Sequence, residues 1–144
     1  MINSRKVSDL DPIARAVCEK HMALCKAVGL TILITSTYRD YEQQEALYAQ
    51  GRTTPGNKVT NARAGQSFHN FRVAWDSVPI INGKCDWNAS GKPFKLMVEL
   101  GRQAGAECGA DWKKFKDYPH FQFVPKGLSI KDAKTRFDTN RTIY

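Results

Sequence analysis

Apolar residues recur at helical spacing near the start of the chain. Asp11-Pro12 supplies an N-cap followed by proline at the first helical position, and the pattern continues to Gly29. The apolar positions of this segment are Leu10, Ile13, Val17, Leu24 and Val28. They predict a core helix with this face turned inward. His21 lies in the middle of that helix, where we expect a partly exposed structural role.

Three apolar runs predict strands. Residues 30–35, LTILIT, are β-branched and apolar, which favours a short strand buried on both faces or nearly so. Residues 73–81 predict a second strand, which ends at an Asn82-Gly83 turn. PHFQFV, residues 119–124, predicts a final strand.

Capping residues and periodicity predict the other helices. Asp40, with Gln43 three residues later, resembles a capping box and predicts a helix that runs to Gly51. Residues 93–104 predict another helix, and the polar, basic tail predicts one more short helix at 129–137. In the helix predicted at residues 93–104, the inward positions are Phe94, Met97, Val98 and Leu100.

Size and charge narrow the class of protein. With 144 residues, 42% of them hydrophobic, the chain fits one compact domain with one core. No run approaches the roughly 18 apolar residues of a membrane span, and no signal peptide is recognisable at the N-terminus. The net charge of +8 favours polyanionic partners such as nucleic acid, anionic lipid or an acidic wall polymer.

The four cysteines do not suggest a disulfide framework. No C-x-x-C pair is present, and Cys18 and Cys25 lie seven residues apart on the predicted helix. That spacing separates them by about 10 Å, too far for a disulfide. We therefore interpret the cysteines mostly as core thiols.

Two histidines lie at junctions between loops and strands, where functional sites are commonly built. His69 follows a loop at residues 52–66 and has Asp76 seven residues later. His120 begins the final strand and has Asp117 three residues before it. A catalytic zinc takes three protein ligands from His, Asp, Glu or Cys, with a fourth position left for water. His69, Asp76 and His120 supply such a set, with Asp117 as an additional carboxylate.

The convergence of His69 and Asp76 requires a turn. Residues seven apart in a regular strand point to opposite faces, so the chain has to bend at Asn70-Phe71-Arg72. The alternative is structural, with an ordinary His–Asp polar pair and a strand histidine satisfied by its neighbours. Neither H-x6-D nor D-x-x-H decides between the two interpretations alone.

Taken together, the motifs resemble a known family. S-x-H-x-x-x-x-A-x-D at residues 67–76 and D-x-P-H at 117–120 are similar to motifs of the D-alanyl-D-alanine carboxypeptidase and VanY-like zinc peptidases. Residues 36–53 and 109–121 resemble the phage endolysin branch, the L-alanyl-D-glutamate peptidases. The resemblance implies an α+β, Hedgehog/DD-carboxypeptidase-like fold with a small, mainly antiparallel sheet flanked by helices. It also implies that residues 1–144 are a single catalytic domain without a separate cell-wall-binding domain.

The resemblance also implies roles for the four residues of the predicted site. His69, Asp76 and His120 would be the ligands of a Zn²⁺ cofactor, and Asp117 would be the general base. In such a site zinc acidifies a water and polarises the scissile carbonyl, while a carboxylate takes the proton.

Further residues would contact the substrate. Arg39 would hold the substrate or its tetrahedral intermediate, since a permanently charged donor suits a developing oxyanion. Ser67 and Gln44 would be substrate-side groups. At position 72 family members usually have glycine, whereas this chain has Arg72. If that position requires positive φ, arginine would cost about 1–2 kcal/mol.

The implied activity is hydrolysis of the L-alanyl-D-glutamate bond of peptidoglycan by a monomeric phage or prophage endolysin. We expect no nucleic-acid partner and no membrane span. The protein would be made in the host cytoplasm and would reach the cell wall in the periplasm through a holin-type pore. Two alternatives stay open: a D-alanyl-D-alanine carboxypeptidase with the same zinc site, and a non-catalytic basic module that binds wall polymer or nucleic acid.

Overall fold

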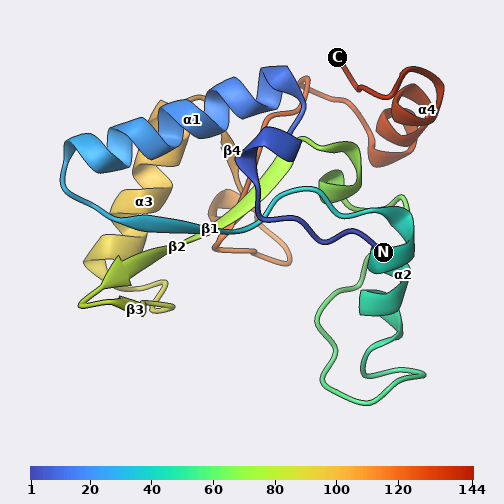
Figure 1. The fold of residues 1–144 in the computed structure, drawn as a ribbon, viewed down its shortest axis with the longest axis horizontal. Helices are drawn as coiled ribbons and strands as arrows, with labels where there is room; N and C mark the ends of the chain where they lie inside the picture. Colours follow the sequence, from blue (N-terminus) through green and yellow to red (C-terminus); the bar gives the residue numbers. More distant parts are fainter.

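The computed structural model describes residues 1–144 and contains four α-helices around a small sheet (Figure 1). The helices are α1 (Pro12–Ala27), α2 (Tyr41–Ala49), α3 (Lys92–Gln103) and α4 (Ile130–Asn140), with short 3-10 helices η1 (Val7–Asp9), η2 (Phe68–Phe71) and η3 (Gly109–Asp111). The strands are β1 (Ile32–Ser36), β2 (Ala74–Ile81), β3 (Lys84–Cys85), β4 (Glu107–Cys108) and β5 (His120–Gln122). None of the helices combines the length and apolar character that a membrane-spanning helix needs.

The sheet is antiparallel, in the order β1-β2-β5-β4, and β3 forms a hairpin with β2. The predicted turn at Asn82-Gly83 is confirmed, because both residues have positive φ, as a type I′ hairpin turn requires. The predicted α+β class, with a small antiparallel sheet flanked by helices, is therefore confirmed.

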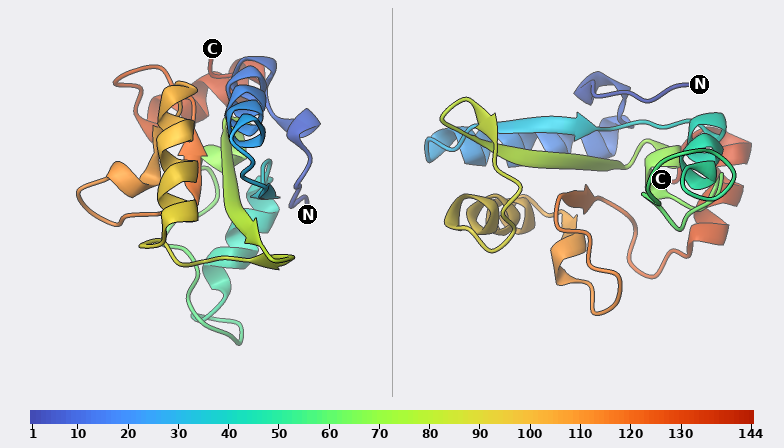
Figure 2. Two further views of the ribbon diagram at one scale, coloured as in Figure 1. Left: turned by 90° about the vertical axis from the view of Figure 1, so that its left-hand side faces the viewer. Right: turned by 90° about the horizontal axis from the view of Figure 1, so that it is seen from below.

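The main core lies between the sheet and the helices α1 and α3, which contact each other (Figure 2). Trp75 of β2 and Phe121 of β5 are opposite each other in register, stack with their rings at 16°, and are fully buried. The four predicted inward positions of α3 are all buried.

The inward face of α1 differs from the predicted one. Ile13 and Val28 are 48% and 55% exposed, respectively, and Val17 and Leu24 are only partly buried. The buried residues are instead Ala14, Cys18, His21 and Cys25. Cys18, His21 and Cys25 face the main core, whereas Ala14 belongs to the second buried cluster, around Phe71.

His21 is completely buried, which corrects the prediction of partial exposure. Its Nε2 lies 2.9 Å from the carbonyl of Met97, and the indole Nε1 of Trp75 donates to its Nδ1 at 3.3 Å. Both ring nitrogens are thus paired in the core, and the predicted structural role fits this position.

Strand β1 is buried on one face only, whereas the sequence predicted burial on both faces or nearly so. It lies at the edge of the sheet, and Leu33 is 40% exposed. Alternate residues of a strand point to opposite faces, and Ile34 and Ser36 are buried on one face while Leu33 is exposed on the other.

The cysteines are all free thiols, as predicted. Three of them are buried, at Cys18, Cys25 and Cys108, while Cys85 is exposed. Burial raises the pKa of Cys18 to about 12 and that of Cys25 to about 11. The buried thiols are therefore in the unreactive, protonated form at neutral pH.

A second, smaller core joins the C-terminal segment to η2. Phe71 of η2 packs against Phe137 of α4 with ring centroids 5.5 Å apart, and Val73 and Ile143 belong to the same buried cluster. The predicted tail helix thus covers the 3-10 helix that carries His69.

Candidate active site

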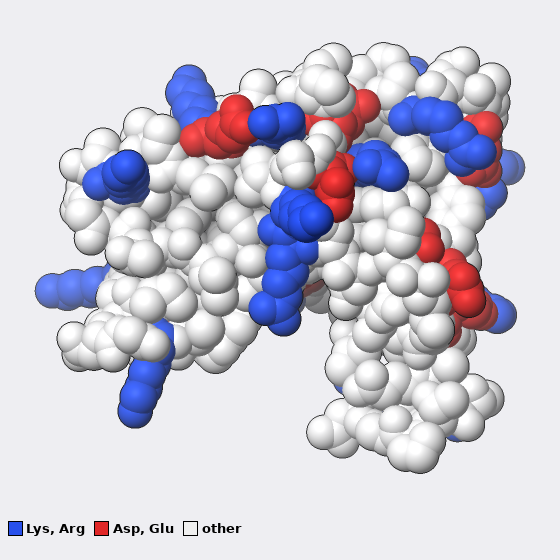
Figure 3. Space-filling view, in the orientation of Figure 1, with Lys and Arg blue, Asp and Glu red and all other residues white.

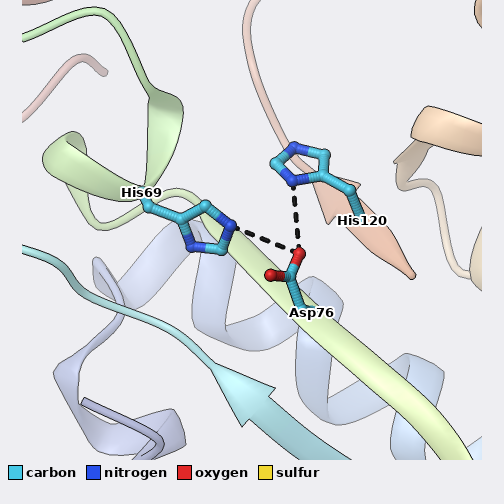
Figure 4. A group of neighbouring side chains, drawn as sticks. All are labelled: His69, Asp76 and His120. Atoms are coloured by element: carbon cyan, nitrogen blue, oxygen red, sulfur yellow. Dashed lines mark hydrogen bonds and ion pairs between the residues drawn. The ribbon is translucent and has the colours of Figure 1, made fainter. Parts of the chain in front are cut away.

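Two of the predicted ligands are cross-strand neighbours. Asp76 of β2 and His120 of β5 are opposite each other in the antiparallel register. Their neighbours in sequence, Trp75 and Phe121, face the core, so Asp76 and His120 point to the opposite side of the sheet. The His120 Nδ1 atom lies 3.3 Å from Asp76 Oδ1 (Figure 4).

The third predicted ligand reaches this face through a turn. His69 lies on η2, where the Ser67 hydroxyl accepts from the His69 amide and Asn70 completes a capping box. Arg72 then adopts the left-handed conformation, with φ 62° and ψ 31°, and redirects the chain into β2. The turn predicted at residues 70–72 is present, and it places His69 Nε2 3.3 Å from Asp76 Oδ1 (Figure 4).

Hydrogen bonds behind each ring determine where its proton lies. The Nδ1 atom of His69 is 2.7 Å from the carbonyl of Thr37, so it donates and Nε2 carries the lone pair. The Nε2 atom of His120 is 2.7 Å from Oε1 of Gln122, so it donates and Nδ1 carries the lone pair. In the neutral rings, both lone pairs therefore point toward Asp76.

This arrangement has the donor set of a metal site. His69, Asp76 and His120 each offer one ligand atom, and these atoms all lie within 4.8 Å of one another. Three acceptors facing one another repel unless a cation or protons lie between them. A tetrahedral ion with ligands at about 2.0–2.1 Å places neighbouring ligand atoms about 3.3 Å apart, which is the separation found from Asp76 to each histidine. The residues present thus fit a divalent metal.

The electrostatics of the three side chains favour a cation as well. Burial raises the pKa of Asp76, but the imidazoles of His69 and His120 outweigh it and hold the pKa well below its usual range. Burial lowers the pKa of His120, but the Asp76 carboxylate outweighs it and raises the pKa. Protons and a metal ion compete for the same lone pair, so metal binding here releases protons.

Arg39 lines the same cleft as the three candidate ligands. Its Nη1 donates to Gln44 Oε1 at 2.8 Å and its Nη2 to Ser36 Oγ at 3.4 Å, while its Nε is buried without a partner. Burial lowers the pKa of Arg39, which the nearby carboxylates oppose, and a guanidinium keeps its charge in any case. Arg39 thus places a fixed positive charge beside the candidate ligands, and Gln44 and Ser36 hold two of its nitrogens.

Gln44 lies behind Arg39 and has no exposed surface, although the sequence suggested a substrate-side group. Its Oε1 accepts from Arg39 and its Nε2 donates to the carbonyl of Ala62 at 2.7 Å. Gln44 therefore orients Arg39 and cannot contact a substrate itself. Ser67, in contrast, lines the cleft and also caps η2.

Asp117 lies at the mouth of the site. Its Oδ2 is 3.9 Å from His120 Nδ1, and its amide donates to the Gly109 carbonyl at 3.1 Å. A Cβ at Gly109 would be 2.2 Å from the Asp117 carbonyl oxygen, so glycine is required for the two segments to approach. Burial raises the pKa of Asp117, while His120 opposes the shift. Asp111, the other carboxylate nearby in sequence, is instead paired with Arg102.

The site continues outward as an open cleft. Its inner part, about 340 Å³, is lined by the candidate ligands, Arg39, Ser67 and Asp117. The outer part, about 880 Å³, runs between the loop at residues 59–66 and the segment at 112–117. Val59 on one wall is 57% exposed and Phe115 on the other 85%, and Phe115 has a positive φ of 53°. A strained, exposed aromatic residue beside a site is a feature typical of ligand binding.

Comparison with known proteins identifies the family. A family model described as D-alanyl-D-alanine carboxypeptidase matches residues 60–123, which include all three candidate ligands. The peptidoglycan L-alanyl-D-glutamate endopeptidase CwlK of Bacillus subtilis is 40% identical over 126 residues, covering 82% of this chain and 75% of CwlK. The chain belongs to the D-alanyl-D-alanine carboxypeptidase family.

One further relative and two solved structures are similar to this chain. The L-alanyl-D-glutamate peptidase of Listeria phage A118 is 30% identical over 131 residues, covering 86% of this chain and 42% of the phage protein. The fold is similar to that of Serratia marcescens L-Ala D-Glu endopeptidase ChiX, with a TM-score of 0.62, 18% identity, and coverage of 82% of this chain and 83% of ChiX. It is also similar to the vancomycin-resistance D,D-pentapeptidase VanY in complex with Zn(II), with a TM-score of 0.59, 14% identity, and coverage of 92% and 80%.

The site contains groups that the sequence did not single out. Thr37 holds His69 through a backbone carbonyl, which no side-chain motif can reveal. Gln122 holds His120, and here a signal existed, because residues two apart on a strand share a face. Trp112, 5.2 Å from the His120 ring between centroids, lines the cleft as well.

Proposed function

We propose that this chain is a zinc-dependent peptidoglycan peptidase that hydrolyses the L-alanyl-D-glutamate bond of the stem peptide. One observation carries the metal-dependent chemistry: the lone pairs of His69 and His120 converge on Asp76 at the spacing of a tetrahedral site. The bond is proposed from the names of CwlK and of the phage peptidase.

His69, Asp76 and His120 would hold the zinc. When bound, zinc supplies a Lewis acid that polarises the scissile carbonyl and lowers the pKa of a water. Asp117 accepts the proton of the attacking water and passes it to the leaving amine.

Arg39 stabilises the negative charge that develops on the carbonyl oxygen. Because Gln44 and Ser36 fix two of its nitrogens, the guanidinium is oriented before the substrate arrives. The outer cleft, with Val59 and Phe115 on opposite walls, leaves room for the substrate beyond the reacting bond, as an endopeptidase requires.

The family model favours a second candidate, a D-alanyl-D-alanine carboxypeptidase with the same residues in the same roles. Digestion of purified muropeptides followed by mass spectrometry separates the two. Cleavage between L-alanine and D-glutamate supports the proposed bond. Loss of a single terminal D-alanine would instead support the carboxypeptidase activity.

The net charge of +8 offers only a general attraction to anionic wall material. On the face shown in Figure 3, Lys and Arg are spread over the surface and several adjoin acidic residues.

For the place of action, we propose synthesis in the host cytoplasm and release to the periplasmic face of the wall through a holin-type pore. Similarity to the phage peptidase supports a lytic role. Fractionation of infected or induced cells tests it: lytic activity is expected to leave the cytoplasm only when a holin is expressed, and export without a holin would contradict it.

The zinc site is tested by metal analysis together with lysis of outer-membrane-permeabilised cells. We expect about one zinc per chain, loss of lysis with a chelator, and recovery with zinc. His69→Ala, Asp76→Ala and His120→Ala are each expected to lose metal and lysis. Asp132→Ala, an exposed carboxylate in the first turn of α4, is the matched control and keeps both. Full zinc content in all three site variants would refute the assignment.

A further inference from the structure

A line of polar side chains crosses the sheet behind His120. On β5, Gln122 follows His120 by two residues, so both side chains lie on the same face. On β4, Glu107 is opposite Gln122 in the antiparallel register. The line thus begins at Asp76 on β2, passes through β5, and ends on β4.

The hydrogen bonds along this line have a fixed direction. Glu107 Oε2 accepts from Gln122 Nε2 at 2.9 Å and from the indole Nε1 of Trp112 at 3.0 Å. An ionised carboxylate only accepts, so the amide nitrogen of Gln122 has to face Glu107. The amide oxygen then faces His120 at 2.7 Å, and an oxygen requires a proton on His120 Nε2. The lone pair of His120 is left on Nδ1, toward Asp76.

We propose that Glu107 and Trp112 act as positioning residues, which lock the Gln122 amide and thereby hold His120 in the tautomer that can bind metal. The inference rests on the proposed zinc site and adds the set of side chains that keeps one of its ligands competent. Glu107 does not line the cleft that holds the candidate ligands, so it acts on His120 through Gln122.

Removal of the carboxylate has a specific consequence. Without Glu107, the Gln122 amide can rotate by half a turn and present its NH₂ group to His120. A donor there favours the lone pair on Nε2 and the proton on Nδ1, which points that proton at the metal position. Gln122 is almost fully buried, so water does not readily replace the lost partner.

His69 provides an internal contrast. Its proton is fixed by the carbonyl of Thr37, which is only an acceptor and cannot rotate to become a donor. The tautomer of His69 therefore needs no further support, whereas that of His120 depends on the orientation of an amide. Loss of an outer hydrogen-bond partner of a ligand typically weakens metal binding about 10- to 100-fold.

The test measures zinc dissociation by competition with a chelator, and the tautomer of His120 by ¹⁵N NMR of the histidine rings in the metal-free and zinc-loaded protein. The variants are Gln122→Leu, Glu107→Leu, Glu107→Gln and Trp112→Phe. Glu107→Gln keeps an acceptor oxygen for Gln122, and Trp112→Phe keeps the ring beside His120 but removes the indole donor. Glu42→Leu, an exposed carboxylate on α2, is the matched control.

Gln122→Leu is expected to weaken zinc binding about 10- to 100-fold. Glu107→Leu is expected to weaken it in the same direction and to populate the Nδ1–H form of His120, while Glu107→Gln restores most of the affinity. The zinc affinity of Trp112→Phe should lie between that of Glu107→Leu and that of the wild type. His69 should keep one tautomer throughout.

Two failures are distinguishable. If the wild type binds no zinc, the proposed function fails. If the wild type binds zinc and Glu107→Leu remains within twofold of it with an unchanged His120 tautomer, the positioning role is overturned, even if Gln122→Leu is impaired. Because Glu107 lies at the surface, loss of folding would not account for its effect, and a circular dichroism spectrum checks this point.

Discussion

Arg72 occupies a backbone position that normally favours glycine, and replacing it tests how the turn before β2 is stabilised. Its φ of 62° lies in the left-handed region. The guanidinium lies 3.9 Å above the Tyr38 ring, and its Nη1 donates to the Asp9 carbonyl at 3.1 Å. The side chain thus ties the turn that follows His69 to the N-terminal segment.

The competing free energies can be compared directly. The left-handed conformation costs a non-glycine residue about 1–2 kcal/mol. The cation–π contact contributes about 0.5–1 kcal/mol, and the charge-assisted hydrogen bond about 1.5–3 kcal/mol. The contacts therefore offset the strain, and arginine is tolerated where glycine would be conformationally easier.

Arg72→Ala loses the contacts but keeps the strain, so we expect a loss of about 2–4 kcal/mol in the free energy of unfolding. Arg72→Gly loses the same contacts but relieves the backbone strain, so we expect its loss to be smaller than that of Arg72→Ala by about 1–2 kcal/mol. Urea unfolding measures both values, and the Tm should fall by about 2–4 °C per kcal/mol.

A second left-handed arginine serves as the control. Arg141 has the same φ of 62° at the end of α4, but its guanidinium lies 6.0 Å from the Phe137 ring, at the limit of a cation–π contact. Arg141→Gly should therefore be neutral or stabilising by up to about 1 kcal/mol. An Arg72→Gly variant that is more stable than the wild type would refute the claim that the contacts of the Arg72 side chain offset its backbone strain.

Three further predictions concern the catalytic base, the cleft and the thiols. Asp117→Asn should keep zinc and fold while the rate of hydrolysis falls about 10²- to 10⁴-fold; loss of zinc would make Asp117 a ligand, and full activity would exclude it as the base. Phe115→Gly should raise KM on muropeptides without lowering the Tm, because it removes a cleft wall and a left-handed aromatic residue together; an unchanged KM would contradict the binding role. A thiol reagent at neutral pH should label one cysteine per native chain, Cys85, and four after denaturation; fast labelling of two or more native thiols would contradict the buried core.

Secondary structure was largely predictable because local signals and tertiary packing agree. Asp11 and Asp40 cap α1 and α2 through their side chains, as their positions in the sequence indicated. The burial of individual residues was less predictable. Ile13 is apolar yet exposed, and His21 is polar yet buried, because the close contact of α1 with α3 selects side chains by size and by available partners.

The site was predictable in composition but not in its supporting hydrogen bonds. His69, Asp76 and His120 lie together as the motifs suggested, and the bend that joins the first two is formed by a left-handed residue that is not glycine. Gln44 was expected at the substrate and lies behind Arg39 instead. A motif specifies which side chains are present, whereas their partners depend on strand register and loop packing.

The position of the site between two cores explains why so many distant segments contribute to it. Asp76 and His120 are held from the main core, through the stacked Trp75 and Phe121 beneath them. His69 is held from the second core, because Phe71 on the same 3-10 helix packs under α4. The distance from His69 to Asp76 therefore depends on how the two cores are joined, and Arg72 lies at that junction. Contacts from Arg72 to the N-terminal segment hold this turn, and a looser turn would let the two halves of the candidate metal site move independently.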